Sequence, residues 1–97
     1  MDTSSTTHRE LLGVAADARI QFVETRLVGW IAAARPADAP PFDGSMRLSD
    51  LGVDSLQLVD IKFELDQLVG YELDVSLFIK NPTLRELAQE SLRVSGL

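Results

Sequence analysis

The chain has 97 residues, a length that predicts one domain with a single modest core. Its net charge of −6 disfavours nucleic acid and anionic membranes as partners, and the absence of cysteine excludes disulfides. No apolar run approaches the length of a bilayer span, and the polar start lacks the pattern of a secretory signal, so we expect a cytoplasmic protein.

The chain starts with a polar segment, and we expect residues 1–8 to form a disordered tail. Thr7 and Glu10 match a capping box, in which a threonine caps the start of a helix and a glutamate reaches back to it. Apolar residues then recur at the three-and-four spacing of an amphipathic helix. This spacing predicts a first helix over residues 9–34, ended by Pro36.

The sequence leaves open a break within this first helix. Gly13 and Asp17 are weak helix formers, so the stronger helix could begin near residue 18. The segment that follows, residues 35–49, holds three prolines and has no clear periodicity. It is therefore expected to be a long surface loop.

The second expected helix covers residues 55–69. Asp54 is a favourable N-cap, Gln57 completes an Asp-led capping box, and Gly70 would end the helix in the left-handed conformation. Six acids against one lysine give residues 54–74 a charge of −5. This acidity favours partners that present arginine and lysine, and a plain solvated face explains it equally well.

A short turn of helix is expected at residues 76–80, followed by a last helix over residues 84–93 that a capping box of Thr83 and Glu86 would start. Only residues 71–75 could be extended.

Together the elements predict an all-α fold over residues 9–94, with residues 95–97 as a C-terminal tail. The fold would be a small four-helix bundle of three main helices and one short helix, with a long loop between helices 1 and 2.

The second helix carries apolar residues on two nearly opposite faces, at about 100° per residue. A small bundle would bury the first face, which consists of Leu58, Ile61, Leu65 and Leu68. The second face is an apolar stripe of Leu56, Val59 and Phe63, bordered by the acids Asp60 and Asp66. Either the preceding loop covers the stripe through Phe42 or Met46, or the stripe is left for a protein partner.

Ser55 opens this helix without catalytic groups around it in the sequence. A nucleophilic serine needs a base, and the only histidine is His8, near the N-terminus, where we expect it to be exposed. In the first turn of a helix, unpaired amides and the positive end of the dipole favour an attached anion, such as a phosphodiester. Judged from the tripeptide Asp54-Ser55-Leu56 alone, Ser55 is more commonly an ordinary serine in the first turn of a helix, next to the capping residue Asp54.

The combination of motifs resembles an acyl carrier protein. The resemblance is carried by residues 51–56 (Leu-Gly-Val-Asp-Ser-Leu), the acidic helix, Gly70, residues 75–78 and residues 81–88 (Asn-Pro-Thr-Leu-Arg-Glu-Leu-Ala). It implies a four-helix bundle whose serine, Ser55 here, receives 4′-phosphopantetheine from coenzyme A. A separate phosphopantetheinyl transferase does this with magnesium, and the arm then carries acyl groups as thioesters on its own thiol.

The resemblance also implies that the helix after the serine is the main recognition helix. Asp54 matches the family residue before the serine and would help to place magnesium during loading, and no resident metal site is expected from one histidine without cysteine. The docking residues implied by the resemblance are Leu56, Val59, Asp60, Phe63 and Asp66.

The subtype is indicated by two short segments. Residues 52–55 (Gly-Val-Asp-Ser) with residues 81–83 (Asn-Pro-Thr) look more like polyketide carriers than fatty-acid carriers. Peptidyl carriers are similar, but more often have a second glycine and a histidine or aspartate before the serine. Helix upstream of residue 18 departs from the family. Because the chain begins with Met1 and has no linker after Leu97, we expect a free-standing carrier.

The expected function is therefore that of a monomeric, non-catalytic carrier that tethers acyl or polyketide intermediates on Ser55. Its implied partners are the transferase, an acyltransferase or ligase that loads the arm, and a ketosynthase or condensation and tailoring enzymes. The alternatives are a peptidyl carrier of a nonribosomal peptide pathway and a helical adaptor that has no prosthetic group and binds a basic partner through the acidic helix. An autonomous hydrolase is disfavoured because the base is absent.

Overall fold

The computed structural model describes residues 3–97. Its helices are α1 (Thr3–Leu12), α2 (Arg19–Ala34), α3 (Ser55–Val69), α4 (Ser76–Ile79) and α5 (Leu84–Ser95), with 3₁₀ turns at Ala16–Ala18 and Ser49–Leu51. The described residues form no strand, and their isolated β-bridge pairs Arg47 with Thr83. The predicted all-α class, with three main helices and one short helix, is confirmed, and α1 is an additional helix.

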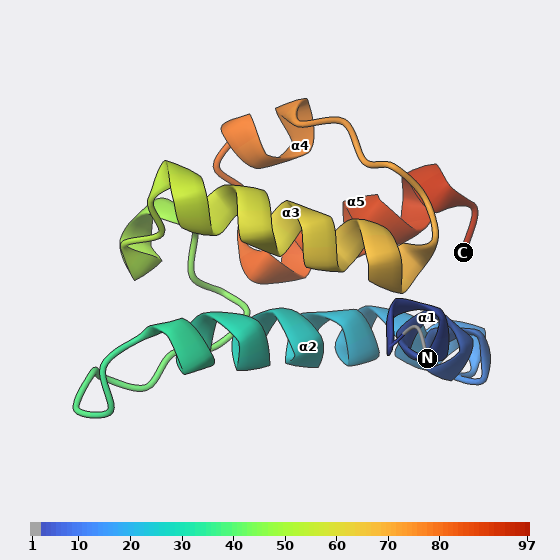
Figure 1. Cartoon of the computed structure of the whole chain (residues 1–97), viewed down its shortest axis with the longest axis horizontal. Coiled ribbons are helices and arrows are strands. Elements are labelled where there is room, and N and C mark those ends of the chain that lie inside the picture. Colours follow the sequence, from blue (N-terminus) through green and yellow to red (C-terminus); the bar gives the residue numbers. More distant parts are fainter. Residues whose placement is uncertain (1–2) are drawn as a thin grey trace.

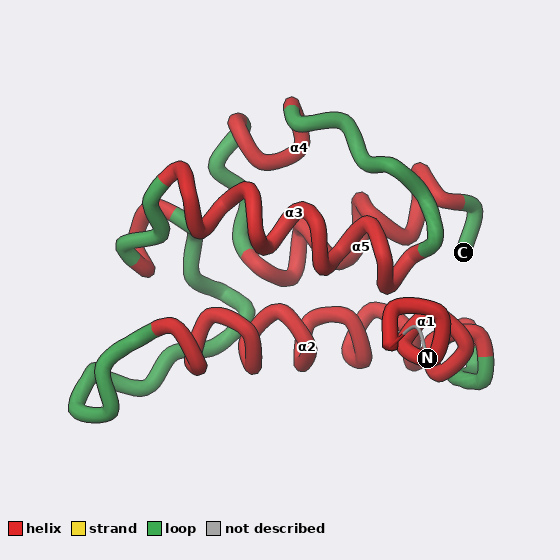
Figure 2. Tube along the Cα trace, viewed as in Figure 1, coloured by secondary structure: helices red, strands yellow, loops and turns green. Residues whose placement is uncertain are grey.

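The helices form a bundle that has a helix, α1, at one end and a long loop at the other (Figures 1 and 2). α2 lies along one side of the pair formed by α3 and α5, and α4 lies on the other side (Figure 1). α1 packs mainly against α3, and α2 packs mainly against α5. α1 lies at the end of the bundle where α3 ends, whereas the long loop after α2 lies at the end where α3 begins (Figure 1).

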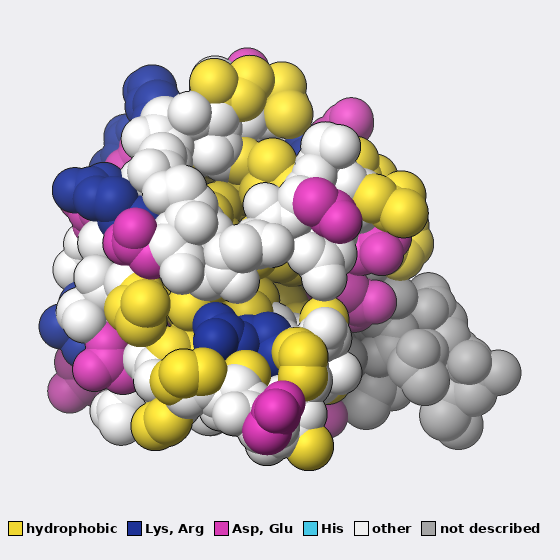
Figure 3. Space-filling model, turned by 90° about the vertical axis from the view of Figure 1, so that its left-hand side faces the viewer, with side chains coloured by type: hydrophobic (Ala, Val, Ile, Leu, Met, Phe, Trp, Pro, Cys, Tyr) yellow, Lys and Arg dark blue, Asp and Glu magenta, His cyan; other side chains and the backbone are white. Residues whose placement is uncertain are grey.

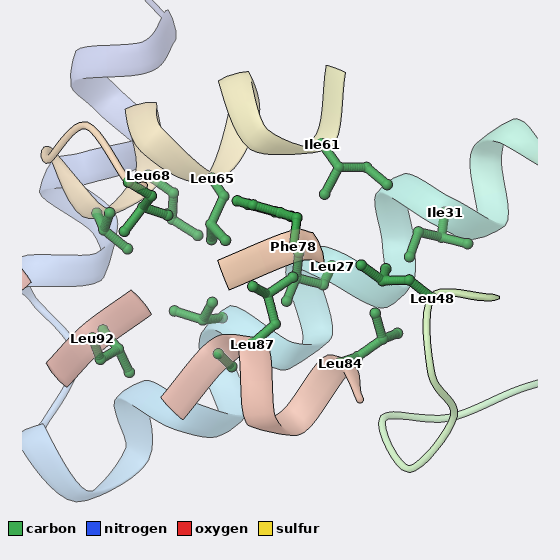
Figure 4. Close-up of a cluster of buried hydrophobic side chains, with 14 of the residues drawn as sticks. Leu27, Ile31, Leu48, Ile61, Leu65, Leu68, Phe78, Leu84, Leu87 and Leu92 are labelled. Atoms are coloured by element: carbon green, nitrogen blue, oxygen red, sulfur yellow. The ribbon is translucent and has the colours of Figure 1, made fainter. Parts of the chain in front are cut away.

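The core is enclosed by α2, α3, α4 and α5 (Figure 4). Each main helix contributes a leucine without exposed surface, namely Leu27, Leu65 and Leu87. Phe78 from the short α4 is also buried, with 3% of its surface exposed. Each such side chain contributes roughly 1.5–3 kcal/mol by leaving water. On α3, the face expected to be core packs inward as predicted: Ile61, Leu65 and Leu68 are buried and Leu58 is half-buried.

The tail predicted over residues 1–8 is corrected by the structure, because α1 begins at Thr3. Residues 1–2 lie outside the described part of the chain. Thr7 and Glu10 lie inside α1, so their capping-box pattern does not mark the start of a helix. A helix of 10 residues is marginal in water by itself, so α1 depends on tertiary packing.

The single helix predicted over residues 9–34 is also corrected, since two helices occupy this stretch. α1 stops at Leu12, where glycine follows and makes a further helical turn less favourable. A 3₁₀ turn containing Asp17 precedes the start of α2 at Arg19. The break between the two helices therefore lies around Gly13 and Asp17, where the sequence had allowed for one.

α1 is held to the end of α3 by one apolar and one polar contact. Leu11 is completely buried in the core. His8, expected to be exposed, is half-buried, and its Nδ1 lies 2.8 Å from the carbonyl oxygen of Leu68. A carbonyl only accepts, so Nδ1–H donates here and satisfies one of the carbonyls that a helix end leaves unpaired. Gly70 has φ of 67°, and a Cβ there would lie 2.6 Å from the His8 ring, so both the backbone conformation and the nearby imidazole favour glycine.

The long loop packs toward α5 and leaves the apolar stripe of α3 uncovered. Phe42 lies beneath the guanidinium of Arg35, whose Cζ is 5.0 Å from the ring centre. The carbonyl of Met46 accepts a hydrogen bond of 3.1 Å from the amide of Leu84, at the start of α5. Phe42 and Met46 thus pack at the edge of the core, and the alternative in which they cover the stripe is not realised.

The predicted C-terminal tail over residues 95–97 is partly ordered into the fold. α5 extends to Ser95, two residues beyond the predicted end of this helix. Leu97 is half-buried against the core, and its carbonyl accepts a 3.3 Å hydrogen bond from Nη1 of Arg19. The final residues therefore close the bundle against the start of α2.

Two carboxylates accept hydrogen bonds from backbone amides at the starts of the last two helices. The predicted capping box of Thr83 and Glu86 is confirmed, and the hydrogen bond from the Thr83 amide holds the pKa of Glu86 below its ordinary value of 4.5. At the start of α4, the amide of Ser76 donates to Asp74 and lowers the pKa of that carboxyl below 3.8.

These caps predict a loss of stability in acid. A carboxyl whose pKa is lower in the folded state binds protons first in the unfolded state. The free energy of unfolding should therefore decrease as the pH falls below 4.5, where Glu86 of the unfolded chain binds protons, and below 3.8, where Asp74 does. The decrease should continue until the pH has passed the lowered pKa values of these two carboxyls in the folded protein. Urea unfolding at stepped pH measures this dependence. The Glu86→Gln variant, which keeps an acceptor but cannot titrate, should lose less stability over the same interval, and an identical loss in variant and parent would contradict the prediction.

Candidate functional site

The start of α3 is fixed by the capping box that the sequence predicted. The amide of Gln57 donates to Oδ1 of Asp54 at 2.8 Å, and the amide of Asp54 donates to Oε1 of Gln57 at 3.1 Å. The preceding Gly52 has φ of 70°, which turns the chain from the 3₁₀ turn into the cap. The predicted helix over residues 55–69 has the observed bounds of α3, and Gly70 ends it in the left-handed conformation.

Ser55 is the first residue of α3 and its side chain is exposed. The capping box uses two of the amides that a helix start leaves unpaired. In the described part of the chain, the amides of Ser55 and Leu56 have no acceptor. Two free amides at the positive end of a helix are a suitable donor set for phosphate oxygens, so the residues present fit a phosphate-linked group on this hydroxyl.

In the part of the chain that the structure describes, neither the histidine nor the nearest lysine lies next to Ser55. His8 contacts Leu68, 13 residues further along α3, which places the imidazole about 20 Å from the start of the helix at 1.5 Å per residue. Lys62 forms an ion pair with Asp66 and lies two turns away from Ser55. The arrangement presents the hydroxyl of Ser55 to solvent.

No metal site is found among residues 3–97, because these residues contain no group of three or more His, Cys, Asp and Glu placed to hold an ion. Asp54 is exposed, and its Oδ1 is occupied by the cap. A single carboxylate of this kind can contribute to a metal only together with ligands from another molecule.

The apolar stripe of α3 faces solvent over its whole length. The exposed fractions are 72% for Leu56, 63% for Val59 and 59% for Phe63. Figure 3, which faces the end where α3 begins, shows hydrophobic side chains alternating with acids along its right margin. Exposed large apolar side chains in a row are unusual on a free monomer and are typical of interaction surfaces.

The two acids that border the stripe differ in their surroundings. Asp60 is exposed and has no ion-pair partner among the residues that the structure describes. Asp66 is half-buried: its Oδ2 accepts from Nζ of Lys62 at 2.7 Å, and its Oδ1 accepts from the amide of Leu73 at 3.0 Å. Asp60 is therefore free to contact another molecule, whereas Asp66 also holds the connection between α3 and α4.

Two further exposed apolar residues were not found from the sequence. Val75, which precedes α4, is 52% exposed, and Ile79, its last residue, is 72% exposed. Their spacing of four residues places them on one side of a helical turn, and Phe78 between them points into the core. Both apolar residues can be seen in the sequence, but a helix of four residues is too short for its periodicity to show which of them face solvent.

The structure thus has a capped helix with an exposed serine as its first residue, inside a small helical bundle. The family described as phosphopantetheine attachment site matches residues 26–90, from the middle of α2 to the middle of α5. Because this match covers most of the chain, the protein belongs to that family, whose members carry phosphopantetheine and are generally non-catalytic.

The curated relatives are distant and much larger. The chain is 35% identical over 63 residues to the non-reducing polyketide synthase PKS16 of Cladonia grayi, and equally to the non-reducing polyketide synthase crz7 of Cladonia metacorallifera. The matched segment is 65% of this chain and 3% of each synthase. No solved structure matches the chain. Among residues 3–97, no helix is both long and apolar enough to cross a membrane.

Proposed function

We propose that the protein is a non-catalytic carrier that holds acyl or polyketide intermediates on a 4′-phosphopantetheine arm at Ser55 and presents them to partner enzymes. The observation that carries this proposal is the exposed hydroxyl of Ser55 beside the unpaired amides at the capped start of α3. This serine lies within the segment that matches the phosphopantetheine attachment family.

The proposed loading step uses a second protein, because in the described part of the chain His8 and Lys62 both lie away from Ser55. A phosphopantetheinyl transferase would join the Ser55 oxygen to the phosphorus of coenzyme A that bears the pantetheine, breaking the pyrophosphate bond. Adenosine 3′,5′-bisphosphate leaves, and the proton of the hydroxyl passes to a base of the transferase. We propose that Asp54 contributes its exposed carboxylate to magnesium at this step, since Oδ1 alone is engaged in the cap.

When bound, the arm supplies a thiol that carries acyl groups as thioesters. The residues of this chain would position that arm. The amides of Ser55 and Leu56 would hold the phosphate, and the capping box keeps both amides pointing out of the helix start.

We propose that partners dock on the stripe of α3 that faces solvent. The proposed docking residues are Leu56, Val59, Phe63, Asp60 and Asp66. Apolar side chains would supply contact area, and the acids would attract enzymes with basic surfaces. Because Asp66 also holds the amide of Leu73, its contribution depends on an intact connection to α4.

The proposed cargo class follows the relatives. Both are named as polyketide synthases, which favours acyl or polyketide intermediates over aminoacyl ones. The proposed partners are accordingly an acyltransferase or ligase that loads the arm, and a ketosynthase with tailoring enzymes. A condensation enzyme of a nonribosomal peptide pathway is the corresponding partner in the peptidyl alternative. The chain is proposed to act as a monomer.

The proposal is tested by incubating the protein with coenzyme A, magnesium and a broad-specificity phosphopantetheinyl transferase, followed by intact mass measurement. The expected result is a complete shift by one phosphopantetheine group, which disappears when magnesium is chelated. An unshifted mass would favour the helical adaptor that carries no prosthetic group, because the exposed stripe would serve such an adaptor equally well.

Charge reversal at the stripe gives a separate prediction. Asp60→Lys should slow association with the transferase and reduce the dependence of that rate on salt, because exposed charges act mainly by steering the encounter. Stopped-flow association rates over a range of ionic strength measure both effects. Asp38→Lys, at an exposed position in the long loop, is the matched control and should change the rates less. Equal effects of the two reversals would show that only net charge matters.

A further inference from the structure

The turn between α4 and α5 is joined by hydrogen bonds to the segment that leads into α3. Asn81 lies in this turn and is half-buried. Its Oδ1 accepts a hydrogen bond of 3.0 Å from the amide of Ser49, and its Nδ2 donates one of 2.9 Å to the hydroxyl of the same serine. Its carbonyl accepts a hydrogen bond of 2.8 Å from Nη1 of Arg47. Both segments lie at the end of the bundle where α3 begins (Figure 1).

Asn81 supplies the cap that the 3₁₀ turn before α3 does not have locally. This turn begins at Ser49, whose amide has no backbone acceptor among residues 3–97, and the preceding Leu48 makes no capping hydrogen bond with its side chain. The first amides of a helical turn need an acceptor from outside the turn. Oδ1 of Asn81 accepts from Ser49 as an N-cap side chain would, although it lies 32 residues further along the chain.

The backbone at residue 81 shows why asparagine suits this position. Asn81 has φ of 55° and is the one residue other than glycine with a positive φ among residues 3–97. Glycine adopts this conformation readily, and asparagine is among the few other residues that tolerate it. Glycine would satisfy the backbone but would leave the amide of Ser49 without its acceptor. Asparagine meets both requirements.

The 3₁₀ turn is connected to Ser55 by a short segment. The amide of Gly52 donates to the carbonyl of Ser49 at 3.3 Å, and the capping residue Asp54 follows directly before α3. Ser49 and Ser55 are both exposed, and even a fully extended chain of this length would span at most about 22 Å. A specific protein interface covers roughly 20–30 residues on each side. An enzyme that binds around the hydroxyl of Ser55 therefore also covers the 3₁₀ turn.

We propose that Asn81 is a positioning residue for the transfer of phosphopantetheine to Ser55. It acts through Ser49, by holding the 3₁₀ turn in the conformation that the transferase binds, so that the turn does not have to be ordered on binding. This inference rests on the proposed function. It assigns to the turn between α4 and α5 a role in loading that is separate from the docking role of the stripe on α3.

The expected kinetic signature is a change in KM. The cap of α3 is formed by Asp54 and Gln57 without Asn81, so the surroundings of the Ser55 hydroxyl are the same once the complex has formed. A mobile 3₁₀ turn would have to be ordered in the complex and in the transition state alike. An equal loss of binding in both states raises KM and leaves kcat unchanged.

The experiment measures initial rates of phosphopantetheine transfer from coenzyme A by a broad-specificity transferase, with magnesium, at stepped concentrations of the unmodified protein. Asn81→Gly keeps the positive φ and removes the side chain, so its KM should be several-fold higher than that of the parent at an unchanged kcat. Asn81→Asp keeps an oxygen that can accept from the amide of Ser49, so its KM should stay close to that of the parent.

Thr83→Ala is the matched control for a loss of stability. It removes the side-chain cap of α5 two residues further along the chain, where the hydroxyl of Thr83 accepts from the amide of Glu86 rather than contacting the 3₁₀ turn. The KM of Thr83→Ala should equal that of the parent. An equal rise in KM in Thr83→Ala and Asn81→Gly would mean that lost stability alone is responsible, which would overturn the inference.

Hydrogen exchange of single amides, followed by NMR, tests the contact in the parent protein. Ser49 and Ser55 are both exposed, but among residues 3–97 the amide of Ser49 has an acceptor and that of Ser55 has none. After correction for intrinsic rates, exchange should be slower at Ser49 than at Ser55, and Asn81→Gly should remove this difference. Equal exchange at the two amides in the parent would contradict the contact on which the inference depends.

The outcomes separate this inference from the proposed function. If Asn81→Gly is modified with the KM of the parent, the positioning role is overturned and the carrier function stays intact. A rise in KM of the same size in Asn81→Asp and Asn81→Gly overturns it as well, because the hydrogen bond to the amide of Ser49 would then not carry the effect. A parent protein that accepts no phosphopantetheine overturns the carrier function itself.

Discussion

Ser55→Ala is expected to abolish the transfer of phosphopantetheine completely. Among residues 8–97, whose side chains the structure describes, no other hydroxyl is exposed beside free amides at the start of a long capped helix. We propose that the transferase joins the group to this oxygen, so removal of the oxygen would leave no acceptor. Intact mass after incubation with coenzyme A, magnesium and transferase measures the effect, and the expected result is the unmodified mass at all times.

A second serine provides a matched control for this variant. Ser76 is exposed and is also the first residue of a helix, the short α4. Ser76→Ala should accept the group at the rate of the parent. Because Asp54 and Gln57 form the cap of α3, Ser55→Ala should unfold at nearly the same temperature as the parent protein. Residual modification of Ser55→Ala would place the attachment on another residue.

Leu11→Ala is expected to cost about 2–5 kcal/mol of unfolding free energy, the usual range for removing a buried leucine side chain. Leu11 is completely buried although it lies in α1, outside residues 26–90 that match the family. Total stabilities of single domains are about 5–15 kcal/mol, so this loss would be a large part of the whole. Chemical denaturation of parent and variant measures it.

The neighbouring residue is a matched control. Leu12 is 47% exposed, and Leu12→Ala should change the free energy of unfolding by no more than about 0.5 kcal/mol, the usual range for surface substitutions. Similar small effects of both substitutions would mean that α1 is not part of the cooperative unit. A large loss for Leu11→Ala alone would establish that the N-terminal helix belongs to the folded domain.

The helices with strong local signals were predictable from the sequence. Asp54 with Gln57, and Thr83 with Glu86, form capping boxes whose partners are three residues apart, so the signal and the structure lie within one turn. Gly70 likewise ends α3 through its own backbone conformation. The start of α3, where the candidate site lies, could therefore be predicted from residues that are close together in the chain.

The N-terminal helix was not predictable in this way. Its residues before Leu11 are polar and the Thr7–Glu10 pattern resembles a helix start, yet α1 begins at Thr3. What fixes α1 is the burial of Leu11 and the contact of His8 with Leu68, 60 residues away. Such long-range contacts leave no periodic signal in a short polar segment.

The exposure of the stripe also required the structure. Periodicity placed apolar residues on two faces of α3, and the second face, the stripe, could have been covered by the long loop. The loop instead follows α5 through the hydrogen bond from Leu84 to Met46. The direction of a loop depends on contacts at its far end, so the sequence of α3 by itself could not decide between core and surface.

The central claim is that the hydroxyl of Ser55 carries a phosphopantetheine arm in the working protein. The most direct measurement is the intact mass of the protein isolated from the cells that make it, followed by fragmentation of the peptide that contains residues 51–62. We expect an added phosphopantetheine, with or without an acyl group, located on Ser55. Native protein that is active in its pathway and unmodified at this residue would contradict the account.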